Sequence, residues 1–216
     1  MQKVAILGSG ESGYGAAVLA SKLGDKVFLS DAGKITAPKI EALKDLNIEF
    51  EEGQHSLDKI TSADLVIKSP GIPDEAEVVK AIKAKDLPVI SEIEYGSLHT
   101  DAGLIAVTGS NGKTTVVNMI YHVLKDEIKD TVLAGNVGIS FAKSVAETQA
   151  KNYVLEVSSF QLDGIVTFRP NIAIITSITP DHLDRYAYNF DLYTASKFKI
   201  AGNQTSEDYF IYNADE

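Results

Sequence analysis

Short apolar runs rich in β-branched residues alternate along the whole chain with stretches whose apolar residues recur every three or four positions. The first pattern predicts strands and the second predicts helices. The predicted strands are residues 4–7, 27–29, 65–67, 89–90, 104–107, 131–133, 153–157, 172–176 and 209–212. The predicted helical stripes are Ala16, Leu19, Ala20 and Leu23, then Ile40, Leu43 and Leu46, then Val116, Val117, Ile120, Val123 and Leu124. Such alternation predicts an α/β fold with parallel sheets covered by helices on both faces.

A polar stretch separates two series of these elements. Its polar residues, with one glycine, are Glu92, Glu94, Ser97, His99, Thr100, Asp101 and Gly103. We interpret residues 92–102 as a polar bridge, and we expect one domain in residues 1–95 and another in residues 96–216. Each series opens in the same way, with a strand that runs into a glycine loop and then a helix.

The second glycine loop, within the segment 106–115, is the most informative motif. Gly109 and Gly112 lack a Cβ, so the backbone can turn tightly and direct N–H groups at phosphate oxygens. Lys113 would neutralise the β- and γ-phosphates of a nucleotide, and the Thr114 hydroxyl would ligate Mg²⁺. The predicted ATP-binding residues are Gly109, Ser110, Asn111, Gly112, Lys113, Thr114 and Thr115. Two residues separate the glycines where the broad P-loop pattern has four, which indicates a narrower group of ATP-using proteins.

The first glycine loop, residues 8–13, fits the pattern G-x-G-x-x-G, and Asp31 follows at the end of the next predicted strand. Taken alone, this pattern favours a nicotinamide dinucleotide and therefore an oxidoreductase. The same loop serves any ligand whose pyrophosphate lies at a helix N-terminus, or it simply packs a helix on a strand. A non-catalytic nucleotide-binding module is a further alternative.

Three polar residues and two short segments after the P-loop are candidates for chemistry. Glu156 ends a predicted strand, where a carboxylate suits Mg²⁺, although a solvated glutamate is equally compatible. His182 follows Pro180 and is a candidate metal or substrate ligand, or else a structural histidine. Lys197 lies in a helical pattern, where an exposed surface lysine is the simpler interpretation. The segment 158–162 either lines a pocket or caps a helix, and the segment 135–138 is either part of a site or a turn.

Composition narrows the classes of function. The 216 residues have 44% hydrophobic and 23% charged positions, which is ordinary for a globular protein. A formal net charge of −10 argues against a nucleic-acid partner, and the lack of cysteine excludes disulfides and thiolate metal sites. The apolar start is too short for a signal peptide, and no run approaches the roughly 20 apolar residues of a membrane span. We therefore expect no membrane insertion and a cytoplasmic location.

The motifs together resemble the Mur ligases, the ATP-dependent amino-acid-adding enzymes of peptidoglycan synthesis. They occur in the family's order across the whole chain: residues 108–115, 135–138, Glu156, 181–185 and 195–197. The resemblance implies an N-terminal Rossmann-like domain followed by an incomplete P-loop ATPase-like central domain. The segments 156–162 and 69–72 are similar to the branch of the family that adds D-glutamate.

This resemblance implies a ligase whose substrates are ATP, D-glutamate and UDP-N-acetylmuramoyl-L-alanine, with an acyl-phosphate intermediate. Another Mur-type amino-acid ligase is the alternative within the family. The implied catalytic residues are Lys113, His182 and Lys197. Thr114 and Glu156 would hold one of two Mg²⁺ ions. His182 and Lys197 would hold the other, with Lys197 as a carbamate formed with CO₂, because an unmodified lysine repels a cation.

The residues implied for the UDP-linked substrate are Gly10, Glu11, Ser12, Gly13, Asp31, Ser69, Asn136, Ser158 and Gln161. An arginine-containing stretch of the family is replaced here by residues 31–34, so either Asp31 or Lys34 takes its place. Family members also have a third, C-terminal domain. We therefore expect this chain to be part of a longer enzyme, to lack ligase turnover alone, and to keep UDP-sugar binding in residues 1–95.

Overall fold

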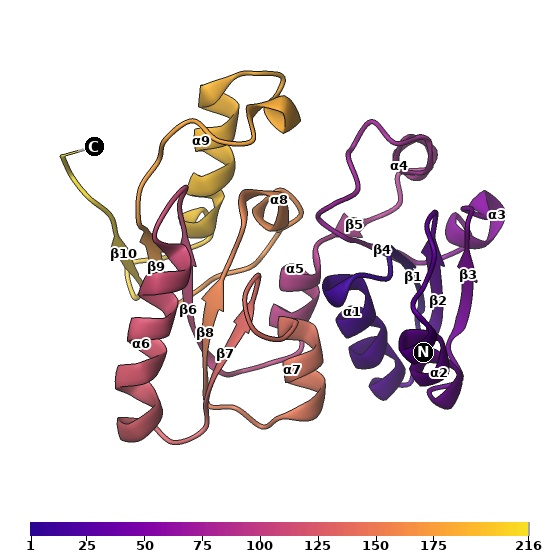
Figure 1. The fold of residues 1–216 in the computed structure, drawn as a ribbon, viewed down its shortest axis with the longest axis horizontal. Helices are drawn as coiled ribbons and strands as arrows, with labels where there is room; N and C mark the ends of the chain where they lie inside the picture. The colour runs from indigo at the N-terminus through magenta and orange to yellow at the C-terminus, as the bar shows by residue number, and fades with distance from the viewer. Residues whose placement is uncertain (216) are drawn as a thin grey trace.

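The computed structural model describes residues 1–215 and contains two five-stranded parallel β-sheets, one after the other along the chain (Figure 1). The first has the order β3-β2-β1-β4-β5, with β1 (Lys3–Leu7), β2 (Lys26–Asp31), β3 (Glu49–Glu52), β4 (Leu65–Lys68) and β5 (Val89–Ile90). The second has the order β10-β9-β6-β8-β7, with β6 (Gly103–Thr108), β7 (Thr131–Gly135), β8 (Asn152–Glu156), β9 (Ile172–Ile175) and β10 (Tyr209–Ile211). The α/β prediction is confirmed, with a Rossmann-like first sheet and an ATPase-like second sheet.

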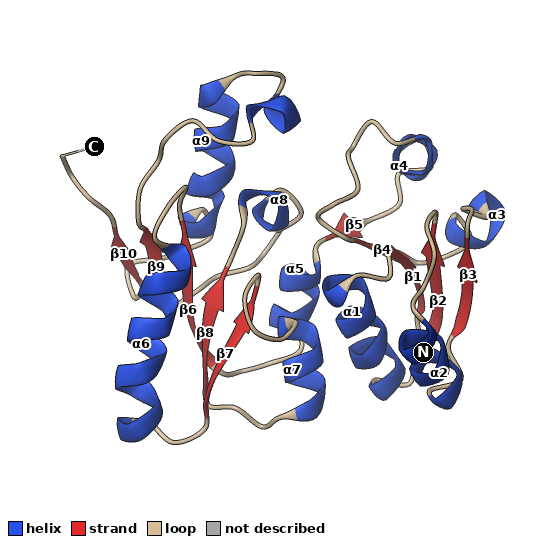
Figure 2. Cartoon of the chain, in the orientation of Figure 1, coloured by secondary structure: helices blue, strands red, loops and turns tan. Residues whose placement is uncertain are grey.

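Helices connect the strands and cover the sheets (Figure 2). They are α1 (Glu11–Lys22), α2 (Ala37–Asp45), α3 (Leu57–Ile60), α4 (Glu77–Lys83), α5 (Glu92–Ser97), α6 (Lys113–Glu127), α7 (Phe141–Glu147), α8 (Ser159–Leu162) and α9 (Phe190–Phe198), with the 3-10 turns η1 (Leu183–Tyr186) and η2 (Lys199–Ala201). Within residues 1–215, none of these helices has both the length and the apolar character that a membrane crossing needs.

Every predicted strand is present, with ends that differ by a residue or two. Strand β3 was missed, because its sequence carries three glutamates and only Phe50 is apolar. It is the edge strand of the first sheet and pairs with β2, and polar side chains are tolerated at a sheet edge.

The prediction of one buried face on α6 needs a correction. Val117 is fully buried, but Val123 is 63% exposed because Tyr121, and not Val123, packs against the sheet.

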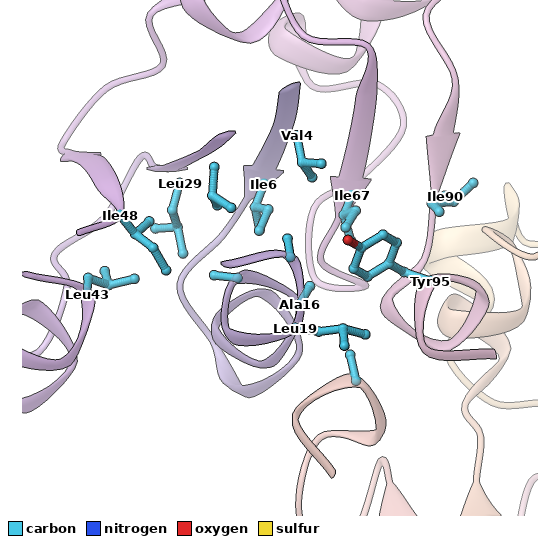
Figure 3. Packing of buried hydrophobic residues seen from close by; sticks show 14 of the residues in the cluster. Val4, Ile6, Ala16, Leu19, Leu29, Leu43, Ile48, Ile67, Ile90 and Tyr95 are labelled. Atoms are coloured by element: carbon cyan, nitrogen blue, oxygen red, sulfur yellow. The ribbon is translucent and has the colours of Figure 1, made fainter. Parts of the chain in front are cut away.

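The core under the first sheet joins α1 and α5 to the strands. Ile6 and Ile67 pack with Leu19 of α1, and Tyr95 reaches into the same cluster from α5 (Figure 3). Tyr95 is one of the largest side chains that are fully buried. Helix α5 therefore belongs to the hydrophobic core of the first sheet and is not a solvated connection.

The prediction of a polar bridge at residues 92–102 is thus wrong for its first half. Glu92 and Glu94 are each 1% exposed. Glu92 Oε1 accepts hydrogen bonds from Ser140 Oγ and from the Ala142 amide, both at 2.6 Å, so the acid is bonded to the start of α7. These carboxylates accept hydrogen bonds from buried donors in segments that are distant in sequence. The pattern of polar residues along the chain does not reveal such contacts.

Helices α1 and α7 pack against each other between the two sheets, as Figure 1 also shows. A Cβ on Gly15 would collide with the Ser140 hydroxyl, so the close approach depends on glycine at this position. Lys22 Nζ donates to the Ala146 carbonyl at 3.0 Å, and Arg185 Nη2 donates to the Pro70 carbonyl at 3.2 Å. Packing and hydrogen bonds therefore join the two halves of the chain.

Stability is expected to fall between pH 5 and pH 7.5 because of Glu92. Burial raises the pKa of Glu92 from 4.5 to about 7, against the opposing effect of the hydrogen bonds from Ser140 and the α7 amides. Between these values the unfolded chain loses the proton and the folded chain keeps it, so the free energy of unfolding decreases by about 3 kcal/mol as the pH rises. We expect Glu92→Gln to remove this slope in urea unfolding at the two pH values. The control is Glu147→Gln, at an exposed position of α7, and an unchanged slope in Glu92→Gln would contradict the assignment.

Candidate nucleotide-binding and ligation site

The register of the second sheet brings three strand ends together. Glu156 at the end of β8 pairs with Val107 of β6 on one side and with Gly135 of β7 on the other. Because the strands are parallel, the loops after β6, β7 and β8 leave the same edge, where ligands of open α/β sheets bind. The loop after β6 contains the predicted ATP-binding residues, and the loop after β7 contains Asn136.

The P-loop has the strand–loop–helix form that was predicted. Gly109 has a φ of +143°, and a Cβ there would collide with the Thr176 hydroxyl. Gly112 has a φ of +83° and is the N-cap of α6. Lys113 Nζ donates to the Gly109 carbonyl at 2.8 Å and to the Ser110 carbonyl at 3.0 Å, so the side chain folds over the loop. The assignment of residues 109–115 to ATP stays a prediction.

Glu156 connects the P-loop helix with the loop after β7. Its side chain is almost fully buried, Oε2 accepts a hydrogen bond from Thr114 Oγ1, and Oε1 accepts one from Asn136 Nδ2, each at 2.7 Å. The alternative of a solvated strand-end glutamate is therefore wrong. A hydroxyl and a carboxylate supply the hard oxygen ligands that Mg²⁺ prefers, with phosphates and water completing its coordination. In the part of the chain that the structure describes, no three His, Cys, Asp or Glu side chains gather as a metal-binding group.

Lys197 is buried, which overturns the interpretation as an exposed surface lysine. Its side chain is on α9, the residue is 2% exposed, and Nζ donates to the Gly109 carbonyl at 2.8 Å. The ammonium also lies 4.6 Å from the centroid of the Tyr193 ring. Burial, and next the positive charge of Lys113, lower the pKa of Lys197 from 10.5 to about 8, while Asp181 acts in the opposite direction. Helix α9 therefore places beside the P-loop a lysine whose neutral form is populated more than that of an ordinary lysine.

A cleft of about 230 Å³ brings five of the predicted site residues together. Lys113, Asn136, Ser158, His182 and Lys197 line it, and the first half of the chain contributes Pro70 and Gly71. His182 has a φ of +48°, its side chain is 61% exposed, and its ring centroid lies 5.5 Å from that of Phe160. Thr114 and Glu156 do not line the cleft, but Glu156 accepts a hydrogen bond from Asn136 of the lining, and Thr114 donates to Glu156.

Ser158 and Gln161 form a capping box at the start of α8, so the capping alternative is confirmed for this segment. Gln161 Oε1 accepts hydrogen bonds from the Ser158 amide at 2.9 Å and from its hydroxyl at 3.0 Å. Gln161 is 2% exposed and does not belong to the lining of the cleft, whereas Ser158 does. The capping interaction keeps Ser158 in position at the edge of the cleft.

The first glycine loop borders a cavity of about 570 Å³, which is also lined by Asp31 and by residues 71–73. Gly10 is the N-cap of α1, and Glu11, Ser12 and Gly13 form its first turn. A Cβ on Gly13 would collide with the Gly8 carbonyl, so the loop needs glycine there. The Ser69 hydroxyl is buried and has no hydrogen-bond partner within residues 1–215.

Asp31 stabilises this loop through hydrogen bonds. Its Oδ2 accepts bonds from the Ser9 amide and hydroxyl, both at 2.6 Å, and its Oδ1 accepts one from the Gly33 amide at 2.7 Å. Burial acts to raise the pKa of Asp31, but these hydrogen bonds outweigh it and lower the pKa below its ordinary value. Lys34, the alternative basic residue, is 85% exposed and donates to Glu52 at 2.7 Å.

One residue of the cleft, Tyr193, and one residue of a neighbouring pocket, Arg185, were not among the predicted site residues. The Tyr193 hydroxyl lies 2.8 Å from Ser110 Oγ, which connects α9 to the P-loop. The spacing of four between Tyr193 and Lys197 is a signal that could have been used, because it places both on one helix face. Arg185 was noted only as part of a motif. Its guanidinium lies 4.6 Å from the centroid of the Phe160 ring, and no local pattern indicates this contact.

Comparison with known proteins gives matches over the whole chain. The family profile of the Mur ligase middle domain matches residues 107–216, and that of the MurD N-terminal domain matches residues 3–78. The chain is 55% identical over 215 residues to UDP-N-acetylmuramoylalanine–D-glutamate ligase of Christiangramia forsetii, which covers 100% of this chain and 48% of that protein. It is 49% identical to the protein of the same name from Bacteroides thetaiotaomicron, covering 100% of this chain and 49% of that one. The chain thus spans about half the length of these relatives.

Solved structures share the fold at lower identity. The UDP-N-acetylmuramate:L-alanyl-gamma-D-glutamyl-meso-diaminopimelate ligase of Neisseria meningitides superposes with a TM-score of 0.67 at 23% identity, covering 100% of this chain and 72% of that one. The UDP-N-acetylmuramate-alanine ligase of Thermotoga maritima has a TM-score of 0.62 at 24% identity, covering 100% and 50%.

Proposed function

The chain belongs to the Mur ligase family, and we propose that it forms the nucleotide-binding half of an ATP-dependent ligase that joins D-glutamate to UDP-N-acetylmuramoyl-L-alanine. The observation that carries this proposal is the meeting of Lys113, the Thr114–Glu156 pair and Lys197 at one edge of the second sheet. The high identity to relatives with that activity in their names supports the choice of D-glutamate. The activity is proposed for a protein of the relatives' full length.

The proposed reaction has two steps, because a carboxylate does not react with an amine at neutral pH. A carboxylate oxygen of the L-alanine end attacks the γ-phosphorus of ATP, and the bond to ADP breaks. The amine of D-glutamate then attacks the carbonyl carbon of the acyl phosphate, phosphate leaves, and the amine loses a proton. Lys113 at the P-loop is suited to neutralising charge on the transferred phosphoryl group.

Two sets of residues fit Mg²⁺ in this proposal. Thr114 and Glu156, which are within hydrogen-bond distance of each other, would hold one ion. His182 and Lys197 would hold the second ion if Lys197 is carbamylated. A bound Mg²⁺ supplies positive charge to phosphoryl and carboxylate oxygens as the reaction proceeds.

The low pKa of Lys197 supports its carbamylation. Only a neutral amine attacks CO₂, and at pH 7 a group with a pKa of about 8 is neutral in about a tenth of the molecules. The new N–C bond converts the side chain to a carbamate, and the amine releases its proton. The product is an anionic oxygen donor that suits Mg²⁺, in a cleft that His182 also lines.

The first half of the chain is proposed to bind the UDP portion of the substrate. Residues 1–95 and 96–216 would then be two domains that share the cleft, and the reaction would take place in the cytoplasm, where ATP is available. This assignment is supported by the cavity beside the first glycine loop and by the Ser69 hydroxyl, which has no hydrogen-bond partner among the described residues. The alternative of a nicotinamide-dependent oxidoreductase leaves the P-loop and the buried Lys197 without a role.

A ligase assay tests the proposal. We expect a protein of full length to release phosphate from ATP when UDP-N-acetylmuramoyl-L-alanine and D-glutamate are both present, and not when either is omitted. L-Glutamate, L-alanine and L-lysine are the matched control substrates. Equal release with a different amino acid would favour another Mur-type ligase, and release that ignores the amino acid would contradict a ligase function.

A further inference from the structure

Two lysines from different halves of the chain lie beside the N-terminus of α1. Lys39 of α2 places Nζ 2.8 Å from Glu11 Oε1 and 2.9 Å from the Ser9 carbonyl oxygen, and its side chain is 23% exposed. Lys143 of α7 places Nζ 5.6 Å from the centroid of the Tyr14 ring, and Lys39 Nζ lies 5.8 Å from the same centroid. Both ammonium groups therefore lie close to the Tyr14 ring at the first turn of α1.

The surroundings of these lysines favour the binding of an anion. The glycine loop leads into a helix of 12 residues, whose first turn carries partial positive charge. The Ser69 Oγ atom is buried without a partner among the described residues, and it lies 2.7 Å from the position that a Cβ on Gly8 would take. Within residues 1–215, this hydroxyl donor therefore lies at the loop without an acceptor.

Glu11 currently occupies this positive environment. Its side chain is 74% exposed and is held by Lys39. The hydrogen bond from Lys39, together with the charges of Lys39 and Lys143, lowers the pKa of Glu11. Lys143 itself has no ion-pair partner within residues 1–215. An exposed carboxylate at a helix N-terminus thus pairs with one lysine and is influenced by the charge of a second.

We propose that Lys39 and Lys143 are the cations that hold the diphosphate of the uridine nucleotide, and that Glu11 releases Lys39 when the nucleotide binds. This inference rests on the proposed function, which places UDP at the first glycine loop. A chain with a net charge of −10 must compensate a diphosphate locally, and the ion pair with Glu52 already engages Lys34. Because Lys143 belongs to α7, the diphosphate would contact both halves of the chain.

Calorimetric titration with UDP and with uridine separates this role from a structural one. We expect Lys39→Met and Lys143→Met each to weaken UDP binding by roughly tenfold, since a charge-assisted hydrogen bond is lost, and to leave uridine binding unchanged. Added salt should weaken UDP binding less in these variants than in the unaltered chain. Lys44→Met, at an exposed position of the same helix α2, is the matched control, with UDP affinity unchanged.

A variant that is expected to bind UDP more tightly guards against the possibility that misfolding explains the losses of affinity. Glu11→Gln removes a negative charge and the partner of Lys39, so we expect UDP to bind roughly two- to fivefold more tightly. Unchanged UDP affinity in Lys39→Met, or equal losses for UDP and uridine, would overturn the inference while leaving the proposed function intact. An unaltered chain that binds neither UDP nor UDP-N-acetylmuramoyl-L-alanine would overturn the proposed function, and this inference with it.

Discussion

Lys197→Ala in a ligase of full length is expected to lower D-glutamate-dependent phosphate release by about a hundredfold or more. A carbamate on Lys197 would contribute anionic oxygens beside the P-loop, and loss of one group that stabilises charge in a transition state has an effect of this size. The buried amine, whose pKa is about 8, lies 2.8 Å from the Gly109 carbonyl oxygen, so alanine also removes a contact to the loop.

The modification itself can be followed without turnover. We expect the 216-residue chain, equilibrated with ¹³C-labelled bicarbonate, to give a carbamate signal in ¹³C NMR that is absent from Lys197→Ala. Lys199→Ala is the matched control, because that lysine is nearby but pairs with Asp163 at 2.9 Å. Full activity of Lys197→Ala, with or without added bicarbonate, would exclude the proposed role, and so would the same carbamate signal in both proteins.

Glu94→Ala is expected to lower the free energy of unfolding by about 3 kcal/mol or more. The Glu94 carboxylate accepts hydrogen bonds from the amides of Val166, Thr167 and Phe168 at 2.8–2.9 Å, and from the Thr167 hydroxyl at 2.6 Å. Glu94 and Phe168 are each 1% exposed, so water cannot easily replace the lost acceptor. Each buried donor left without a partner is destabilising by about 1–3 kcal/mol.

Urea unfolding measures this effect. Glu94→Gln keeps a carbonyl acceptor and should lose only part of the stability, which distinguishes the lost hydrogen bonds from altered packing. Glu41→Ala, at an exposed position of α2, serves as the control. A decrease in the free energy of unfolding of less than about 1 kcal/mol in Glu94→Ala is ordinary for a substitution. Such a result would show that the Glu94 carboxylate does not stabilise the segment 166–168.

Much of the fold and part of the candidate site could be predicted from the sequence. The apolar runs of β1, β6 and β8 gave the strands, because burial on both faces of a parallel sheet leaves a local apolar pattern. Strand β3 has no such pattern and was missed. Gly109 and Gly112 marked the P-loop, since their positive φ angles require residues without a side chain.

Local sequence is sufficient to predict the helices, the strands and the chemical groups of each loop, because periodicity and the conformational demands of glycine act over a few neighbouring residues. The positions of the charged side chains depend on the tertiary packing. Lys197 and Glu92 are buried by segments far away in the chain, and Lys39, not Lys34, reaches the first glycine loop. Burial and ionic contacts of this kind depend on how distant segments pack, and no local pattern encodes that packing.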